Sequence, residues 1–315
     1  MITTLTPSPS LDLEYQLPSL QIGAVNRVTY FGQRAGGKGV NVSRVLVRMG
    51  VATTALVPIN ELESGSFLAS AAIDKIPIKP IEIESGVRFN LTLLHDYKTT
   101  KINAATKAWS KKELTKISDA FHAQAKKSEF AVIGGSLPES TPATWLADLV
   151  RENRKRTRIV VDSSGAALRE VLEASPFLIK PNRDEAEEIL KFPIRDLADA
   201  QLAAQELRNL GPETVLLSLG SAGSIYCSSD SLIHVKPAEL NVQNTVGAGD
   251  ALLAGFIGSF NKGLEFALAC GTAWAEAIIS NHGLHLDVSV QEMTVKRIIG
   301  NGRLRNLLQA ESSHV

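Results

Sequence analysis

The chain has 315 residues, enough for two domains or for one large α/β domain, and either can bury a large core. Lysine plus arginine and aspartate plus glutamate each number 33, so no overall field favours nucleic acid or an anionic membrane, and any anionic ligand has to be held locally. Two cysteines provide neither a disulfide framework nor a metal-binding spacing, which fits a reducing compartment.

The N-terminal stretch MITTLTPSPSLDLEY lacks a basic segment followed by an apolar one, so we predict no signal peptide. The longest apolar runs, Val246–Phe260 and Leu264–Ile279, contain Asp250 and Glu265 and are separated by a polar Asn-Lys-Gly. Neither run reaches the roughly 18 uninterrupted apolar residues of a membrane span, so we interpret both as buried core helices. We expect a soluble, cytoplasmic protein.

The N-terminal third mixes two kinds of segment. The strand-like segments are Leu11–Leu17, Arg27–Phe31, Val87–Leu94 and Thr99–Ala104, and the helical ones are Val40–Met49 and Gly65–Asp74. Within 87–94 apolar and polar residues alternate, as in a strand with one polar face. We interpret segments near 11–32 and 87–106 as a small β-sheet lid beside a main body, within a single domain of residues 1–315.

From about Ser110 onward short apolar runs alternate with helical periodicity. The runs are Phe130–Ile133, Arg158–Val161, Phe177–Ile179 and Val215–Leu217, and the helical segments are Thr141–Glu152, Ala166–Glu173, Arg183–Leu190 and Asp196–Leu210. This alternation predicts a parallel sheet covered by helices on both faces, with ligands beyond the carboxyl ends of the strands. The basic run 151–158 is interpreted as a solvated helix end rather than a nucleic-acid patch.

The segment Gly32–Gly39 reads GQRAGGKG, one letter away from the phosphate-binding pattern GxxxxGK[ST]. Gly39 stands where that pattern has the hydroxyl residue that holds Mg2+, so a nucleotide site of this kind is not expected. We expect instead a glycine loop that a polyol or its phosphate can approach, with Lys38 as a point charge and Asn41 as an amide at the start of a helix. The alternative is a turn before an ordinary helix.

Three further segments follow predicted strands. GGSLP (134–138) offers a hydroxyl to a ligand, and SLGSAG (218–223) leaves room for a nucleotide, with a hairpin turn as the alternative. Asn182 and Glu185 lie three apart at the start of a helix, where they could hold Mg2+ or its waters. By themselves these two are better explained as an N-cap with an acidic first turn.

The segment NTVGAGD (244–250) opens the apolar run that starts at Ala251. Its glycines leave backbone N–H groups pointing at whatever lies before the helix, and the positive end of the helix dipole strengthens their attraction for an anion. Asp250 would repel a phosphate unless it acts on the group that attacks the phosphate. The segment therefore predicts a base beside a phosphoryl group.

Five motifs together resemble the signatures of the PfkB-type, ribokinase-like sugar kinases, in the family's order and over nearly the whole chain. They are AGGKGVNVSRVL (35–46), GGSLPES (134–140), KPNRDE (180–185), SLGSAG (218–223) and NTVGAGDALLAGF (244–256). The GGKG-N-V variant with SLP is most similar to the branch of 1-phosphofructokinase and tagatose-6-phosphate kinase. The resemblance implies a doubly wound, mostly parallel sheet with helices on both faces and a small β-sheet lid, which often pairs with a second subunit.

The resemblance also implies residue roles. Asp250 would be the catalytic base, and the amides of Gly247, Ala248 and Gly249 would hold the migrating phosphoryl group. The sugar and its phosphate would be bound by Asp12, Gly36, Gly37, Lys38, Asn41, Arg88, Ser136 and, from a partner's lid, Arg27. ATP would lie along Lys180, Asn182, Ser218, Gly220, Gly223, Gly249 and Asn281. Mg2+ would be placed by Asn182 and Glu185, and a monovalent cation is a further option.

The implied reaction is ATP-dependent phosphorylation of a ketohexose phosphate to the bisphosphate, with fructose 1-phosphate favoured over tagatose 6-phosphate or fructose 6-phosphate. Three positions depart from the family pattern: Asn244 replaces a common acidic residue, Lys101 a glutamate and Ser8 an asparagine. They leave the base and the anion site intact, but they leave cation activation and the choice of ketose phosphate open.

Two alternatives keep the fold. The first is a kinase of an unphosphorylated sugar or nucleoside, against which the cations Lys38, Arg88 and Arg27 argue, because a neutral polyol gains little from buried charges. The second is a catalytically inactive sugar-phosphate sensor, against which the intact pair Gly249–Asp250 argues.

Overall fold

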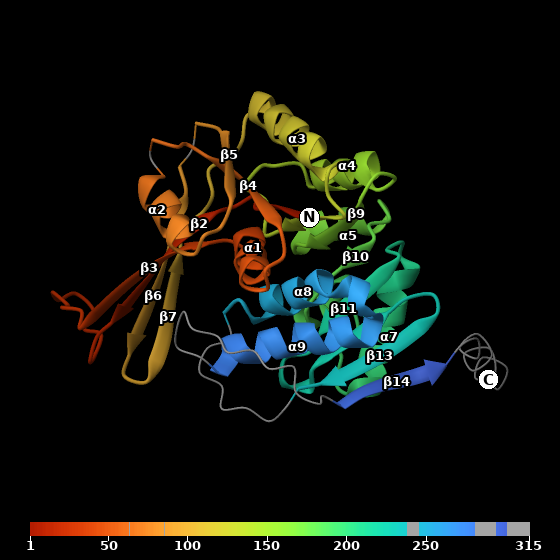
Figure 1. Cartoon of the computed structure of the whole chain (residues 1–315). Helices are drawn as coiled ribbons and strands as arrows, with labels where there is room; N and C mark the ends of the chain where they lie inside the picture. Colours follow the sequence, from red (N-terminus) through yellow and green to blue (C-terminus); the bar gives the residue numbers. More distant parts are fainter. Residues whose placement is uncertain (63, 85, 238–245, 281–293, 301–315) are drawn as a thin grey trace.

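The structure, a computed structural model, describes residues 1–62, 64–84, 86–237, 246–280 and, by its backbone, 294–300. In this part of the chain the strands form a ten-stranded sheet and a separate four-stranded sheet (Figure 1). The large sheet has the order β14-β13-β12-β11-β10-β9-β8-β1-β4-β5, and the small sheet the order β3-β2-β6-β7. The predicted fold class, a mostly parallel α/β sheet with a small additional sheet, is confirmed.

The chain starts inside the large sheet, at the third strand from one edge, and builds outward on both sides. Its strands are β1 (Ile2–Leu5), β4 (Thr53–Ile59), β5 (Ile78–Glu82), β8 (Phe130–Gly134), β9 (Arg158–Asp162), β10 (Leu178–Ile179), β11 (Thr214–Ser218), β12 (Ser224–Cys227), β13 (Ser231–Lys236) and β14 (Thr294–Gly300). Strands from β5 to β11 pair in parallel, and β12, β13 and β14 add antiparallel neighbours. Strand order reverses at β1, and sheets of this kind bind ligands beyond the carboxyl ends of the strands near such a reversal.

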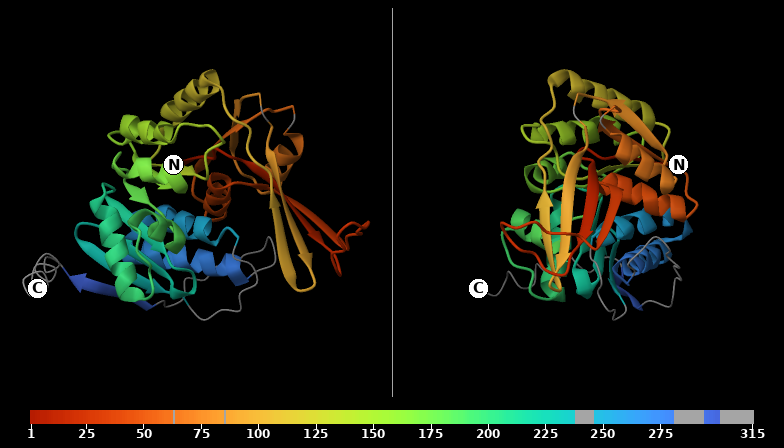
Figure 2. Two further views of the ribbon diagram at one scale, coloured as in Figure 1. Left: turned by 180° about the vertical axis from the view of Figure 1, so that it is seen from behind. Right: turned by 90° about the vertical axis from the view of Figure 1, so that its left-hand side faces the viewer.

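Helices cover the large sheet on both faces (Figure 2). They are α1 (Lys38–Arg48), α2 (Gly65–Ile73), α3 (Lys111–Ala125), α4 (Ala143–Asn153), α5 (Gly165–Leu172), α6 (Arg183–Leu190), α7 (Leu197–Asn209), α8 (Ala248–Gly258) and α9 (Leu264–Ser280). Apolar side chains of α1, α8 and α9 pack on one face, and those of α3 to α7 on the other. Both apolar runs predicted as core helices are helices, and no helix in the described ranges is long and apolar enough to cross a membrane.

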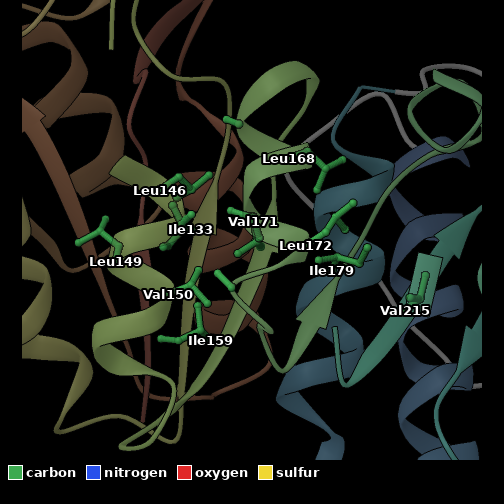
Figure 3. Close-up of a cluster of buried hydrophobic side chains, with 14 of the residues drawn as sticks. Ile133, Leu146, Leu149, Val150, Ile159, Leu168, Val171, Leu172, Ile179 and Val215 are labelled. Carbon is green, nitrogen blue, oxygen red and sulfur yellow. The ribbon is translucent and has the colours of Figure 1, made fainter. Parts of the chain in front are cut away.

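Alternate side chains of each central strand pack against the two helical layers. In β8, Phe130 and Val132 pack toward α1 and α8, whereas Ile133 faces the other layer. Figure 3 shows Ile133 among Leu146 and Val150 of α4. A strand buried on both faces contains a nearly continuous apolar run, which is why the four short runs predicted after residue 110 fall on β8, β9, β10 and β11.

The four-stranded sheet, called the lid here, consists of β2 (Ser10–Gln16), β3 (Tyr30–Gly36), β6 (Arg88–His95) and β7 (Lys98–Asn103) and projects from the body (Figures 1 and 2). β2 pairs with β3 antiparallel and with β6 parallel. Because successive side chains of a strand point to opposite faces, Asp12, Arg88 and Asn90 share one face, and Leu13 and Leu91 share the other. The lid therefore has one polar and one apolar face.

β3 corrects the sequence analysis. A strand was predicted over 27–31 and a glycine loop over 32–39, whereas the strand runs over Tyr30–Gly36 and α1 begins at Lys38. Pairing with β2 supplies the backbone partners for a segment whose polar and glycine residues do not indicate a strand. The lid consequently extends to residue 36 rather than ending near 32, and a single residue, Gly37, forms the turn.

The basic run 151–158 closes α4 and opens β9, as expected of a helix end. Arg151 pairs with Asp148 of the same helix at 2.9 Å. Arg158, the first residue of β9, pairs with Glu129 at 3.0 Å. Part of the charge of this run is thus balanced locally.

Candidate active site

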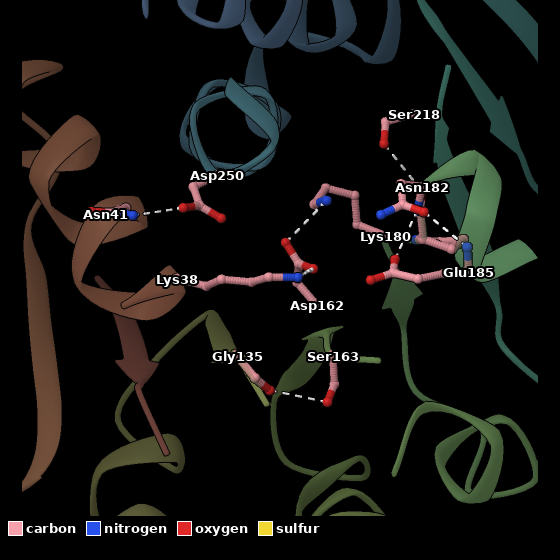
Figure 4. Close-up of polar contacts among 11 residues, drawn as sticks. Lys38, Asn41, Gly135, Asp162, Ser163, Lys180, Asn182, Glu185, Ser218 and Asp250 are labelled. Atoms are coloured by element: carbon pink, nitrogen blue, oxygen red, sulfur yellow. Dashed lines mark hydrogen bonds and ion pairs between the residues drawn. The ribbon is translucent and has the colours of Figure 1, made fainter. Parts of the chain in front are cut away.

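Asp250 lies in the first turn of α8 and is only 7% exposed. Gly247 precedes the helix in the left-handed conformation at φ 83°, and no side chain of the described residues caps it. The first backbone N–H groups of α8 therefore remain available for an anion. One carboxylate oxygen of Asp250 accepts a hydrogen bond from Asn41 Nδ2 at 2.8 Å (Figure 4).

A second helix begins beside the first. α1 starts at Lys38, and it also has no side-chain cap among the described residues. Lys38 and Asn41, from its first turn, extend toward Asp162 and Asp250 respectively (Figure 4). The residue before the helix must be glycine, because Gly37 has φ 109° and a Cβ there would lie 2.4 Å from a methyl group of Thr6.

Asp162, the last residue of β9, holds two lysines (Figure 4). Its carboxylate oxygens lie 2.6 Å from Lys38 Nζ and 3.0 Å from Lys180 Nζ. Burial by itself raises the pKa of Asp162, but the charges of Lys180 and Lys38 outweigh burial and hold this pKa below its ordinary value. For Lys38 burial acts to lower the pKa, yet the contact with Asp162 raises it overall. The carboxylate of Asp162 and the ammonium group of Lys38 are therefore charged at neutral pH.

Asp250 has the opposite behaviour. Burial raises its pKa to about 6, and the negative charge of Asp162 adds to the rise. The hydrogen bond from Asn41 and the charges of Lys180 and Lys38 act in the opposite direction. A carboxyl group with such a pKa is ionised at neutral pH and still takes up a proton readily, which suits a general base.

Asn182 and Glu185 meet in a capping box at the start of α6. Asn182 Oδ1 accepts a hydrogen bond from the Glu185 backbone N–H at 2.8 Å, and Glu185 Oε2 accepts one from the Asn182 backbone N–H at 2.9 Å. The N-cap interpretation of these residues is correct. It leaves Glu185 Oε1 for other ligands, and the charge of Glu185 reaches the site, because it helps to raise the pKa of Lys38.

The segment 218–223 forms the hairpin turn between β11 and β12, through the 3₁₀ helix η1 (Gly220–Ala222). Gly220 and Gly223 have φ 60° and φ 92°, and a Cβ on Gly223 would lie 2.0 Å from the Val235 carbonyl oxygen. Ser218, at the end of β11, bridges to Asn182, so this turn lies beside the start of α6 (Figure 4). The hairpin alternative is correct for the backbone, and the turn borders the same edge of the sheet as Asp162.

The polar face of the lid carries the predicted sugar-binding residues. Asp12 accepts hydrogen bonds from Ser10 Oγ at 2.7 Å and from Asn90 Nδ2 at 2.9 Å. A Cβ on Gly36 would lie 2.1 Å from Asp12 Oδ2, so a larger residue there would displace this carboxylate. Arg88 pairs in register with Ser10, and its buried Nε has no hydrogen-bond partner among the described residues.

The other predicted residues lie in different places. Ser136 follows β8, and its carbonyl oxygen accepts a hydrogen bond from Ser8 Oγ at 2.8 Å. Arg27 is exposed in the connection between β2 and β3, and within the described residues it is not brought to the rest of the site. Asn281 and Asn244 lie outside the described residues.

Two buried residues of the site, Asp162 and Arg44, were not predicted from the sequence. Asp162 had a usable signal, because it is an acidic residue at the end of an apolar run and precedes Ser-Ser-Gly, which marks the carboxyl end of a strand. Arg44 had none, because its acidic partner Asp74 is 30 residues away, at the end of α2, and only the tertiary structure brings the two side chains together.

Known proteins resemble this chain over most of its length. The pfkB family carbohydrate kinase profile matches residues 11–290. The 1-phosphofructokinase of Haemophilus influenzae is 29% identical over 303 residues, covering 94% of this chain and 97% of that protein. The 1-phosphofructokinase of Borreliella burgdorferi is 30% identical over 284 residues, covering 87% and 92%. The crystal structure of phosphofructokinase-2 from Escherichia coli in complex with substrates and products aligns with a TM-score of 0.81 at 28% identity, covering 89% of this chain and 93% of that chain.

An uncapped helix N-terminus beside a buried carboxylate, on this fold and with these relatives, defines a phosphotransferase whose acceptor is an alcohol group. The chain belongs to the pfkB family of carbohydrate kinases, which confirms the resemblance of the five motifs.

Proposed function

We propose that this protein transfers the γ-phosphoryl group of ATP to a hydroxyl group of a ketohexose phosphate, with the bisphosphate as product. Fructose 1-phosphate is the favoured acceptor, ahead of tagatose 6-phosphate and fructose 6-phosphate. The observation that carries the proposal is the position of Asp250, a buried carboxylate with a pKa of about 6 at an uncapped helix N-terminus. Similarity to two 1-phosphofructokinases supports the choice of acceptor.

Asp250 acts as the general base. Its carboxylate accepts the proton of the attacking hydroxyl while Asn41 holds one of its oxygens in place. A positioned base of this kind contributes about 10² to 10⁴-fold to the rate. The acceptor oxygen, once deprotonated, faces the amides of the first turn of α8.

The phosphoryl group in transfer is held by backbone and side-chain donors together. The amides of Gly247, Ala248 and Gly249 stabilise the negative charge of the phosphoryl group in transfer, and Lys38 adds a positive charge from α1. Phosphoryl transfer needs positioning and charge stabilisation more than covalent chemistry from the protein. Lys38 is held for this task by Asp162, which fixes its ammonium group at 2.6 Å.

The donor set at the start of α6 fits Mg2+. Glu185 Oε1 is left over by the capping box, and Asn182 Oδ1 keeps a second lone pair, so both can serve a hard cation directly or through its waters. A Mg2+ ion held there by Glu185 and Asn182 would neutralise charge on the ATP phosphates. Ser218, Gly220 and Gly223 line the neighbouring edge, where the absence of large side chains suits a nucleotide, and the cofactor-binding set includes Lys180, Gly249 and Asn281.

The polar face of the lid binds the acceptor. Asp12 and Asn90 offer a carboxylate and an amide to the sugar hydroxyls. Arg88 favours a phosphorylated acceptor, because a buried guanidinium nitrogen without a partner is costly unless an anion satisfies it. We place Ser136 and, from a second subunit, Arg27 in the same phosphate-binding set.

The proposal also covers the oligomeric state of the protein and its location in the cell. The apolar face of the lid exposes Phe31, Phe89 and Ile102, each more than half exposed, and a second copy of the lid would cover them as a homodimer. Phosphofructokinase-2 of Escherichia coli has been solved in a tetrameric inhibited form and, separately, in complex with potassium, so oligomerisation and a monovalent cation both belong to the hypothesis. Cys227 and Cys270 are free, which supports a cytoplasmic location.

An Asp250→Asn variant and a substrate panel test the proposal together. We expect the variant to lose turnover by about 10² to 10⁴-fold while ATP binding stays measurable, because only the base is removed. Asp148→Asn, on the exposed surface of α4, is the matched control. A coupled ADP-release assay then compares the three ketohexose phosphates with fructose, ribose and adenosine. Undiminished turnover in Asp250→Asn would refute the assignment of Asp250 as the base. Preference for an unphosphorylated acceptor would refute the proposed substrate class.

A further inference from the structure

Arg44 is a buried arginine of α1, and each of its three guanidinium nitrogens donates a hydrogen bond. It is 3% exposed, and its Nε donates to Asp74 Oδ2 at 2.6 Å. Its Nη1 donates to Asn41 Oδ1 at 2.5 Å, and its Nη2 donates to the carbonyl oxygen of Ala35. Burial and the nearby Arg34 lower the pKa of Arg44 to about 10, so the guanidinium is still charged at neutral pH. A buried charge of this kind is retained only where partners satisfy it.

The hydrogen bond from Arg44 decides which way the Asn41 amide points. An amide has one accepting oxygen and one donating nitrogen, whereas a guanidinium only donates. The amide oxygen of Asn41 must therefore face Arg44, which turns Nδ2 toward the carboxylate of Asp250 at 2.8 Å. In the reversed orientation the oxygen would face a carboxylate and the nitrogen a guanidinium, and both contacts would be repulsive.

We propose that Arg44 is a positioning residue for phosphoryl transfer, because it fixes the Asn41 amide that in turn holds the carboxylate of Asp250. The inference rests on the proposed function of Asp250 as the base. Asp74, at the end of α2, holds Arg44 from the other side. The Ala35 carbonyl belongs to β3, so the same guanidinium also joins the base to the root of the lid.

Loss of Arg44 affects one of several groups that act on Asp250. The groups that face Asp250 are Asp162 at the end of β9, Lys180 after β10, and Lys38 and Asn41 on α1. The three charged groups keep their own mutual contacts when Arg44 is removed. Only the Asn41 amide is released, so the base loses a directed donor and its protonated form is favoured.

Arg44→Met tests this with Arg48→Met as the matched control. Arg48 lies one turn further along α1 and also reaches Asp74, at 3.7 Å. We expect Arg44→Met to lower kcat by about 10- to 100-fold with the KM for ATP changed by less than about twofold. The acidic limb of its pH–rate profile should move to higher pH. Arg48→Met should leave both kcat and the limb unchanged.

A double-mutant cycle separates positioning from general support of the fold. In an Asn41→Leu background, which has no amide to orient, Arg44→Met should cause no further loss of kcat. An equal loss in both backgrounds, or an unmoved acidic limb, would overturn the proposal. If Arg44→Met is too unstable to assay, Arg44→Lys, which keeps the charge beside Asp74 but not the planar fork, enters the same cycle.

The outcomes also distinguish this inference from the function on which it rests. Inactive Asp250→Asn with fully active Arg44→Met refutes the positioning role and leaves the base in place. Active Asp250→Asn refutes the base itself.

Discussion

At the residue scale, the site keeps two buried carboxyl groups in different states. Asp162 contacts two ammonium groups, and they more than offset the cost of burying its charge. Asp250 receives an amide hydrogen bond, and burial together with the charge of Asp162 dominates its titration. Two aspartates on neighbouring elements thus acquire different chemistry from their neighbours, one as a fixed anion and one as a group that exchanges a proton.

The pH dependence of the reaction follows from this difference. Asp250, the proposed base, must be ionised to accept a proton, so kcat/KM should fall as the pH drops through about 6, approaching tenfold for each pH unit below it. Because the folded pKa lies above the ordinary value of 3.8, ionisation of Asp250 also lowers the stability of the fold as the pH rises between the two values. Initial rates from pH 4.5 to 9 in a coupled assay measure this acidic limb of the pH–rate profile.

The same experiment has an internal check. Asp250→Asn should show only a low, flat residual rate without this limb, and its melting temperature at pH 7 should equal or exceed that of the wild type. A kcat/KM independent of pH between 5 and 8 in the wild type would contradict the assignment.

Single residues also show what sequence reasoning can reach. Asp250 and Lys38 were predictable because each belongs to a local motif whose spacing has a chemical meaning. Asn182 and Glu185 were predictable as a pair, and local geometry then selected the capping box. Arg44 and the Asp12–Asn90 hydrogen bond were not, because both depend on pairing between segments far apart in the chain.

At the element scale, α8 combines the proposed base with close packing. Its N-terminus carries Asp250, and its middle lies against α9, where a Cβ on Gly255 would be 2.7 Å from Gly271 Cα and 2.8 Å from the Cys270 carbonyl oxygen. Both neighbours are backbone atoms and cannot rotate away. The position of Asp250 is therefore coupled to the spacing of two helices.

Gly255→Ala should separate α8 from α9 and destabilise the protein by about 1 to 3 kcal/mol, as overpacking in a tight core does. The shift should also lower kcat, because α8 carries the proposed base. Gly65→Ala is the control, since nothing lies within 4 Å of its added methyl group at the start of α2. Urea unfolding and steady-state rates measure both effects. Equal stability of the two variants would contradict the packing argument.

Elements differed in how well sequence predicted them. The buried parallel strands were found because they contain uninterrupted apolar runs, as in β8 and over residues 159–161 of β9. β3 was misplaced, since Gln33 and Arg34 lie in the lid sheet, where pairing with β2 rather than burial holds the strand. The predicted class of fold survived this error because the large sheet alone determines it.

At the scale of the whole molecule, the lid presents its polar face to the acceptor in the proposed mechanism and an apolar face to solvent. Phe89 is 53% exposed on that apolar face, which also carries Phe31 at 51% and Ile102 at 56%. A protein monomer seldom leaves so much aromatic and aliphatic surface together. We propose that a second subunit covers this apolar face of the lid.

Phe89→Asp should convert a dimer into a monomer without unfolding it, because the side chain is half exposed and a carboxylate would be buried in the interface. Leu62→Asp is the control, since Leu62 is 95% exposed and lies outside the lid. Light scattering after size-exclusion chromatography gives the mass, and a circular dichroism melt reports the fold. A wild-type chain that is monomeric at micromolar concentration, or a Phe89→Asp variant that stays dimeric, would refute the interface.

Gly37 is the whole connection between β3 of the lid and α1, the helix that carries Lys38, Asn41 and Arg44. This connection has little conformational freedom, because one residue offers only two backbone rotations. A tilt of the lid therefore pulls directly on the start of α1, and with it on the amide that holds Asp250. Binding of the sugar by the lid and alignment of Asp250 would then occur together. The site would be competent for phosphoryl transfer only when the acceptor is bound.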